Sequence, residues 1–322
     1  MQNLFALVLS LIALLLGGCA DKSFYSMSTP AASQADQYVE TDDLSKLPSK
    51  KIAITSFGIE YDTNVVYAGS TKDGLKTTGS FRNTVTLKNV SKEQMQLMAD
   101  NAYIKLVKDL KAAGYDITPY ETYKETPAYQ SLINIVGKES PVSIAFKYGD
   151  SETLSQSDAL VFAPTGMVWY SPNLEEVGSR RANTLTSLGT EVLSMGRAFS
   201  GGKAVPKAEV DLADALNATL LKIYYVVSPV RSYVESKFLE GTFPGDGRTI
   251  VGSGETRLAF RTPGASTMHF TFSKKKPPLD GNAFVRLKKD VQMDPALNTY
   301  QDIENHLDAV REMFMTKLKS GK

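Results

Sequence analysis

An amphipathic helix held between two short strands is the feature that most constrains the fold of this 322-residue chain. Ser91 and Gln94 form a capping box at the start of the helix, and Gly114 is placed to end it. The apolar residues between them recur at spacings of three and four: Met95, Met98, Ala102, Leu106 and Leu110. A strand beginning at Lys51 precedes the helix, and the strand YDIT at 115–118 follows it. This order predicts a right-handed βαβ unit.

A stretch rich in glycine and threonine separates the first strand from this helix. In its second half, Phe81, Val85 and Leu87 alternate with polar residues, as in a strand that has one apolar face. We therefore expect a β-hairpin near residues 60–90, inserted into the βαβ unit.

The remaining apolar patterns indicate a mixed fold. We expect a helix around 128–136 and further strands within 158–166, 220–230, 255–264 and 267–273. The last helix, 299–319, has one apolar stripe: Ile303, Leu307, Val310, Phe314 and Leu318. The fold class is α/β or α+β, with a central mixed sheet and flanking helices. We assign a globular domain to 51–298 and a C-terminal amphipathic helix to 299–322.

The start of the chain carries an apolar run that ends at its only cysteine. Residues 4–16 are apolar except for one serine, which is short for a membrane-spanning helix of about 20 residues. An apolar core of this length followed by small residues is typical of a secretory signal peptide. The residues at its end resemble the bacterial lipobox, a leucine and two small residues before a cysteine: Leu16, Gly17, Gly18 and Cys19.

The lipobox resemblance implies a lipid-anchored protein. The Cys19 thiol would receive a diacylglycerol, the signal peptide 1–18 would be removed, and the new amine would be acylated, often with palmitate, which makes the anchor effectively permanent. The alternative is an uncleaved anchor helix with a chance cysteine, because the first three residues include no Lys or Arg. Ala20, with Asp21 one place later, permits export to the inner leaflet of the outer membrane, facing the periplasm. Residues 19–50 predict a flexible tether with an r.m.s. reach of roughly 30 Å.

No combination of residues predicts an active site or a metal site. A G-x-S-x-G motif is missing, since VGSGE at 251–255 has its letters in the wrong order. His269 lies in an alternating strand and His306 beside an apolar stripe, positions in which a histidine is usually structural. The sequence has two histidines, and its one cysteine is assigned to a lipid. These residues match no common metal site. We therefore expect no catalytic residue, no metal and no cofactor.

Three other patterns have ordinary interpretations. The segment 194–204 contains two phosphate-loop glycines but has glycine where the lysine should be, so a flexible loop is favoured. Asp211 and Asp214 share a predicted helix, and 175–176 is a Glu-Glu pair in a loop; nothing brings them together in a cleft. The basic turn 273–278 is interpreted as a solvated loop, with contact to lipid headgroups as the alternative.

Charge and tyrosine content bear on the kind of partner. The 36 basic and 35 acidic residues nearly cancel, which gives no electrostatic reason to expect nucleic acid. A cluster of tyrosines would either pack the rim of the sheet or line a protein interface: Tyr115, Tyr120, Tyr123 and Tyr129.

The order of elements resembles the start of CsgG-like and TolB-N-like envelope lipoproteins. The lipobox, a first strand with Phe57, an inserted hairpin, a capped helix and a GYDI strand carry this resemblance over roughly the first third of the chain. In the curli secretion channel, hairpins from neighbouring subunits assemble a membrane pore. Here Phe81–Leu87 is shorter than the about 9–11 residues of a spanning strand, and no second hairpin is apparent. We therefore expect a scaffold in place of a pore.

These patterns together predict a lipid-anchored envelope lipoprotein that is not an enzyme. It would act as a scaffold or assembly component for protein partners, which include further copies of itself. Two alternatives stay open: an envelope hydrolase or carbohydrate-active enzyme with an unrecognised site, and a small-molecule or lipid-binding module.

Overall fold

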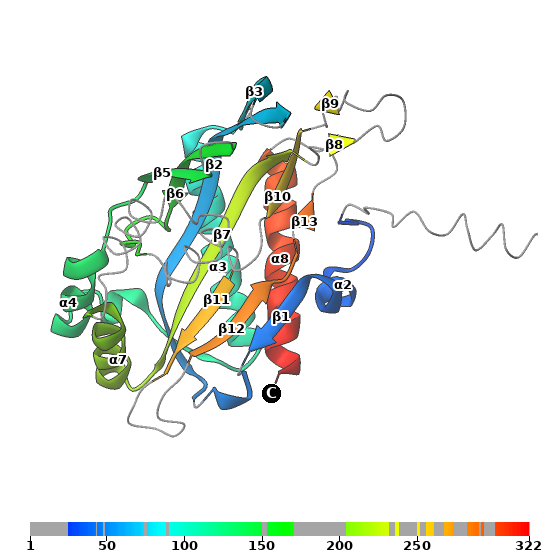
Figure 1. Cartoon of the computed structure of the whole chain (residues 1–322). Helices are drawn as coiled ribbons and strands as arrows, with labels where there is room; N and C mark the ends of the chain where they lie inside the picture. Colours follow the sequence, from blue (N-terminus) through cyan, green and yellow to red (C-terminus); the bar gives the residue numbers. More distant parts are fainter. Residues whose placement is uncertain are drawn as a thin grey trace, which may run out of the picture.

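The computed structural model describes the following residues: 25–42, 44–47, 49–73, 76–87, 90–149, 153–170, 204–231, 236–237, 250–251, 256–260, 267–272, 282–289, 291–292 and 300–321. In this part of the chain, one mixed sheet of eleven strands carries helices on both faces (Figure 1). The predicted fold class, with a central mixed sheet, an inserted hairpin and a C-terminal helix, is confirmed.

Strand β2 (Lys51–Asp73) is the centre of the sheet. It runs parallel to β4 (Asp116–Thr118) and β7 (Thr219–Arg231), and antiparallel to β6 (Thr153–Phe162). The main strand order is β1-β12-β11-β7-β2-β6-β5, and β3 pairs with the far end of β2. The other strands of this sheet are β1 (Val39–Asp42), β3 (Lys76–Thr86), β5 (Val142–Gly149), β10 (Thr256–Phe260), β11 (Thr267–Thr271), β12 (Asn282–Leu287) and β13 (Val291–Gln292), and β8 (Ser236–Lys237) pairs separately with β9 (Ile250–Val251).

The predicted βαβ unit consists of β2, α3 (Lys92–Ala112) and β4. The capping box is present: the Ser91 hydroxyl accepts a hydrogen bond from the Gln94 amide at 3.2 Å, and the Gln94 side chain accepts one from the Ser91 amide at 2.8 Å. Gly114 follows the helix at φ +82°, which a residue with a Cβ rarely adopts, so it ends the helix as predicted.

The helices form two layers because successive residues of β2 point to opposite faces. Ile52 and Ile54 pack in the larger core with α3 and α8 (Tyr300–Ser320). Ala53 packs on the other face in a smaller core with α4 (Pro127–Val136) and α7 (Ala204–Leu216). Within the described residues, no helix is both long enough and apolar enough to cross a membrane.

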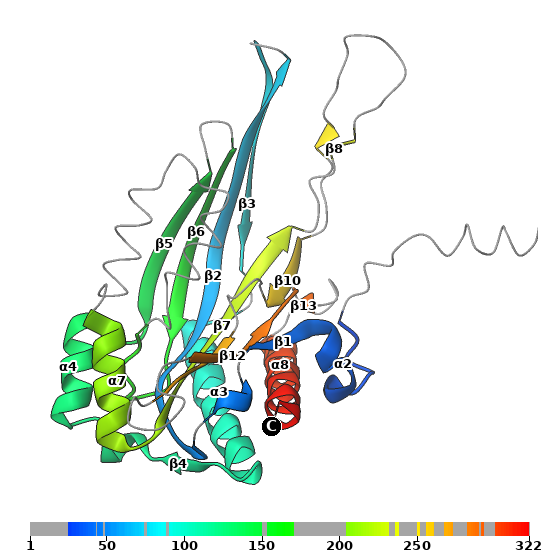
Figure 2. The same ribbon diagram turned by 60° about the horizontal axis from the view of Figure 1, so that its bottom comes forward.

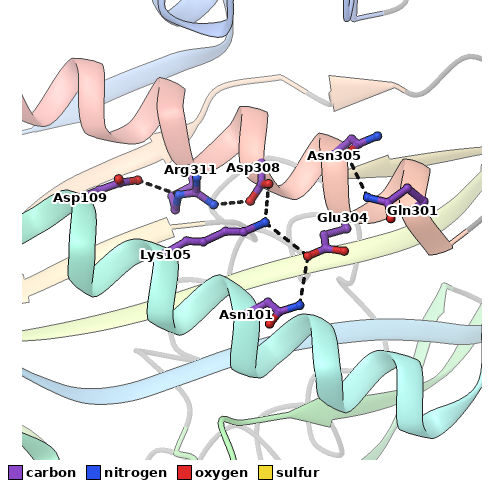
Figure 3. A network of polar contacts seen from close by, with 8 residues as sticks. All are labelled: Asn101, Lys105, Asp109, Gln301, Glu304, Asn305, Asp308 and Arg311. Carbon is purple, nitrogen blue, oxygen red and sulfur yellow. Dashed lines mark hydrogen bonds and ion pairs between the residues drawn. The ribbon is translucent and has the colours of Figure 1, made fainter.

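The two helices of the first layer are joined by charged side chains (Figure 3). Lys105 of α3 lies between two carboxylates of α8, 2.6 Å from Asp308 and 3.3 Å from Glu304. Arg311 of α8 reaches back to Asp109 of α3 at 2.8 Å and also contacts Asp308. The Arg311 side chain is only 14% exposed, so its two bonds are shielded more from water than those of Lys105. This network fixes the C-terminal helix against α3.

Residues 25–47 are not a tether, contrary to the prediction for 19–50. They form a segment, here called the strap, that contains α2 (Ala31–Tyr38), β1 and the short helix η1 (Leu44–Lys46). Strand β1 pairs with β12, and the strap packs its apolar side chains in the larger core: Tyr25, Ala31, Ala35, Tyr38, Val39 and Leu44. Burial of these side chains outweighs the flexibility that the surrounding polar residues suggested.

We expect Arg311→Met to lower the free energy of unfolding by about 1–3 kcal/mol, because two carboxylates lose a charge-assisted hydrogen bond. Lys108→Met is the matched control: Lys108 is exposed on α3, and its replacement should change stability by less than about 0.5 kcal/mol. Urea unfolding of the two variants measures the difference. Equal effects would show that the network in Figure 3 does not hold the two helices together.

Candidate functional site: the hairpin extension

Two long hairpins project together from one end of the sheet (Figure 2). In the first, β2 and β3 pair from Asn64↔Thr86 to Asp73↔Lys76. In the second, β5 and β6 pair from Val142↔Val161 to Gly149↔Leu154. Because β2 also pairs with β6 as far as Gly69, the two hairpins form one four-stranded sheet in the order β3-β2-β6-β5. We call this sheet the hairpin extension.

The inserted hairpin near 60–90 is confirmed, but two expectations about it were wrong. The strand after its turn is β3, Lys76–Thr86, with 11 residues, longer than the predicted segment Phe81–Leu87. A second hairpin, β5–β6, is also present beside the first. Its signal was in the sequence, since apolar residues at every second position from 142 to 148 precede a Gly-Asp-Ser turn. The serines and the glutamine within 153–157 give no apolar alternation, so the returning strand was not predicted from the sequence.

A row of polar side chains crosses the root of the extension. Thr63 donates a hydrogen bond to the Asp158 carbonyl at 2.9 Å, and the Leu87 amide donates to the Thr63 carbonyl at 3.0 Å. Asn64 of β2 joins the strands on its two sides: its amide donates to the Asp158 carboxylate of β6, and its carbonyl accepts from the Thr86 hydroxyl of β3. The β2–β6 register shifts at this point, between Asp62 and Asn64. A bulge at the root increases the twist, which directs the extension away from the layers of helices.

The extension ends in two edge strands of opposite direction. Strand β2 runs toward the tip, so β3 and β6 run back from it, and β5 runs toward it. Among the described strands, β3 pairs only with β2, and β5 only with β6. An edge strand presents a row of backbone N–H and C=O groups that can pair with another chain. The edges of this extension can therefore accept a neighbouring strand on either side.

Two carboxylates lie just below the root, but they do not form an open catalytic site. Glu60 and Asp62 of β2 are both buried, and Glu60 accepts a hydrogen bond from the Tyr224 hydroxyl. A glycosidase needs its two carboxyl groups beside a substrate in a cleft. Groups that are at most 1% exposed do not meet that requirement, so the hydrolase alternative gains no support here.

A buried ionic pair holds α7 on the sheet. Lys222 of β7 lies 2.6 Å from Glu209 of α7, and the two side chains are 2% and 7% exposed. Both ends are shielded from water, so neither charge could lose its partner without a large desolvation cost. The pair is structural in this position.

The two histidines are buried, as expected for structural residues. His269 of β11 stacks on Phe284 with ring centroids 4.4 Å apart. His306 of α8 has Nδ1 2.8 Å from the Asp302 carbonyl and packs edge-on against Tyr25. Burial lowers the pKa of His306, and the bond to Asp302 only partly opposes this effect.

The predicted tyrosine cluster packs the rim of the sheet. Tyr120, Tyr123 and Tyr129 contact one another edge to face, with ring centroids 5.4–5.7 Å apart. The Tyr123 hydroxyl donates to the Ile54 carbonyl, and burial raises its pKa. Tyr115 is separate and lies in the core with α3 and α8. Since Tyr123 and Tyr129 are fully buried, they cannot line an interface in this fold.

Several predicted residues lie outside the described part of the chain. These are the lipobox and sorting residues Leu16, Gly17, Gly18, Cys19, Ala20 and Asp21, and the segments 175–176, 194–203 and 273–278. Asp211 and Asp214 are on α7, and Asp211 is exposed on the side away from the core. Within the described residues, no group of three or more His, Cys, Asp or Glu side chains could hold a metal ion.

Comparison with known proteins gives no assignment. No protein-family model, curated protein or solved structure matches this chain.

We expect Lys222→Met to lower the free energy of unfolding by about 3–5 kcal/mol, because Glu209 is left buried without its cation. The double variant Lys222→Met/Glu209→Met should recover most of this loss, since no buried charge remains. Lys207→Met, at an exposed position of the same helix, is the control. Chemical unfolding measures all three; a double variant no more stable than Lys222→Met would contradict the structural role.

Because His306 is buried, we expect the free energy of unfolding to depend on pH. Its pKa is lower in the folded protein than the usual 6.5, so the unfolded chain binds the proton more tightly. The contribution of the neutral His306 to the free energy of unfolding is complete above about pH 6.5 and is lost as the pH falls toward the pKa of the folded state. His306→Asn keeps a donor for the Asp302 carbonyl without titrating. We expect its loss of stability between pH 7 and pH 5.5 to be smaller by up to about 1 kcal/mol. Unfolding curves with identical pH slopes would refute this assignment.

Proposed function

We propose that this protein is a lipid-anchored envelope lipoprotein that assembles with copies of itself through the hairpin extension. The pair of edges, β3 on one side and β5 on the other, carries the proposal. It would be held by a lipid on Cys19 at the inner leaflet of the outer membrane and face the periplasm. Its role is that of a non-enzymatic scaffold for envelope proteins.

The strand directions make the two edges complementary. In a neighbouring copy of the same orientation, β5 runs toward the tip while β3 of the first copy runs away from it. The two strands would meet antiparallel, which is the direction of every other pair in the extension. A head-to-tail contact of this kind repeats from copy to copy and closes a ring when the rotation allows it. The resemblance to CsgG-like lipoproteins implies assembly of the same type.

The chemistry of the described residues also favours a scaffold over an enzyme. The carboxylates at the root are buried, and the two histidines pack within the sheet and beside the strap. The buried ion pair joins a helix to a strand. None of these groups is placed to meet a substrate, whereas two strand edges are placed to meet another chain.

A second candidate is a membrane pore formed by the assembled hairpins. The two findings that argued against it from sequence, a short strand and a single hairpin, do not hold in the structure. Strands β2 and β3 pair over ten residues of β2, which matches the length of a spanning strand. Release of a dye from vesicles by the assembled protein, but not by monomers, would support this candidate over a scaffold outside the bilayer.

The head-to-tail contact predicts which cysteine pairs form disulfides between copies. In a Cys19→Ala background, we expect one cysteine in β3 and one in β5 to give a ladder of multimers on a non-reducing gel. Each cysteine alone should give no disulfide-linked dimer, because β3 meets β5 and not another β3. Because the register between β3 and β5 of the two copies is unknown, cysteines are placed at a series of positions within 77–85 and 143–149.

Light scattering on the detergent-extracted full-length protein gives the size of the assembly. We expect a ring-sized oligomer, and a monomer when 67–83 and 146–157 are each replaced by an Asn-Gly turn. Cys19→Ala, measured in parallel, shows whether the anchor is needed for assembly. A full-length protein that is monomeric and gives no ladder from any cysteine pair would overturn the proposal.

A further inference from the structure

One buried side chain holds the start of the strap on α8. Among residues 25–30, here called the strap start, only Tyr25 is buried, at 4% exposed, whereas 27–30 are exposed. The Tyr25 ring packs edge-on against His306 of α8 and Tyr38 of α2, with ring centroids 5.7 and 5.5 Å apart. The hydrophobic effect therefore holds the strap start mainly through this one ring.

The rest of the strap is held more firmly. Helix α2 packs on α8 (Figure 1), and strand β1 pairs with β12 over four residues. Asp36 of α2 forms an ion pair with Lys317, near the end of α8, at 2.8 Å. The Gln34 amide links α2 back to the strap start, since it donates to the carbonyls of Ser26 and Thr29 at 3.0 and 2.9 Å. Water can replace these two bonds, so the strap start can open locally while α2 and β1 stay in place.

The surroundings of His306 favour its neutral form. The residue is 1% exposed, and its Nδ1 lies 2.8 Å from the Asp302 carbonyl. A carbonyl oxygen only accepts hydrogen bonds, so Nδ1 carries the hydrogen of the neutral ring. Nε2 is buried and has no hydrogen-bond partner within the described residues. A proton added at Nε2 would therefore create a buried charge whose N–H group has no acceptor.

The charged groups around His306 do not remove this cost. Burial lowers the pKa of His306, and the carbonyl and the negative charge of Asp302, on the same helix, oppose this effect only in part. From the strap, Tyr25 brings no charge, because burial and then the negative charge of Glu312 raise its pKa to about 12. Lys289, which follows β12, lies 4.2 Å from the centre of the α2 tyrosine ring and brings a cation, not an acceptor. The packed strap therefore favours the neutral form of His306.

We infer that protonation of His306 releases residues 25–30 from α8, while α2 and β1 stay bound. Once the Tyr25 ring has left, water reaches Nε2 and solvates the charge and its N–H group. Release requires neither a lipid nor a neighbouring copy. In the proposed function, it would add six residues, about 20 Å when extended, to the chain between a lipid on Cys19 and the domain.

The size of the effect follows from the difference between two pKa values. In the released state, His306 is solvated and has the ordinary pKa of about 6.5, whereas in the packed state its pKa is lower. The ratio of released to packed molecules therefore rises as the pH falls below about 6.5. At pH 5.5, one unit below the ordinary pKa, the gain over pH 7.5 is at most about tenfold.

A spin label on the strap start measures the release. Met27 is 43% exposed, so a nitroxide on Met27→Cys, in a Cys19→Ala background, leaves the core undisturbed. Gln37→Cys, at an exposed position of α2, is the matched control. Electron paramagnetic resonance spectra of the full-length protein in detergent give the ratio of mobile to immobile label. Between pH 7.5 and pH 5.5, we expect this ratio to rise about three- to tenfold at position 27 and to stay constant at position 37. An unchanged ratio at position 27, or an equal rise at both positions, would overturn the inference.

Replacement of each histidine in turn separates His306 from other groups that titrate in acid. His306→Asn keeps a donor for the Asp302 carbonyl without titrating, so the ratio at position 27 should no longer change with pH. His269→Asn removes the only other histidine of the chain and should keep the rise. A rise that persists in His306→Asn would contradict the inference.

Circular dichroism checks that both histidine variants are folded. If His306→Asn does not fold, the midpoint of the rise with both histidines present decides the question. A midpoint near pH 6 supports titration of His306, whereas a midpoint below about pH 5, where carboxylates titrate, would overturn it.

Discussion

The pairing of β2 along its whole length is the constraint on which the rest of the structure depends. Its first half pairs along one edge with parallel β7, and along the other with parallel β4 and the end of antiparallel β6, with helices covering both faces. Its second half continues beyond the helices and is held by β3 and β6. A strand of 23 residues is about 75 Å long, several times the usual strand length. One continuous strand therefore links the hydrophobic core to the proposed assembly surface.

The polar row at the root marks the boundary between two sources of stability. Below it, Ile59 and Tyr61 are fully buried, so the sheet is held mainly by the hydrophobic effect. At the row itself, β3 and β6 are joined to β2 through Thr63 and Asn64. Beyond it, backbone pairing continues, and none of the described helices covers it (Figure 2). An isolated two-stranded hairpin is marginally stable in water, so the pairing of the two hairpins with each other stabilises this region, and the proposed pairing with further copies would add to it.

Local signals in the sequence predicted the elements that depend on local interactions. The capping box and Gly114 define α3, and the apolar stripe defines α8. The strap was missed because its stabilising contacts are distant in sequence: Tyr25 meets His306, and β1 pairs with β12. The same holds for the candidate site. Alternation predicts a strand, but only the topology shows that β3 and β5 are edges, that the two hairpins are neighbours, and that their directions are complementary.

The strap limits what the proposed lipid anchor could do. A flexible tether would keep the domain near the membrane while leaving its orientation free, and the hairpins would meet neighbouring copies only by chance rotation. A strap that is packed on α8 and paired with β12 shortens the chain that could act as a tether. If the proposed anchor and assembly hold, copies kept close to one surface would lose less entropy when β3 of one meets β5 of the next. In that proposal, anchor, strap and hairpin edges would act on the same step, the association of identical copies.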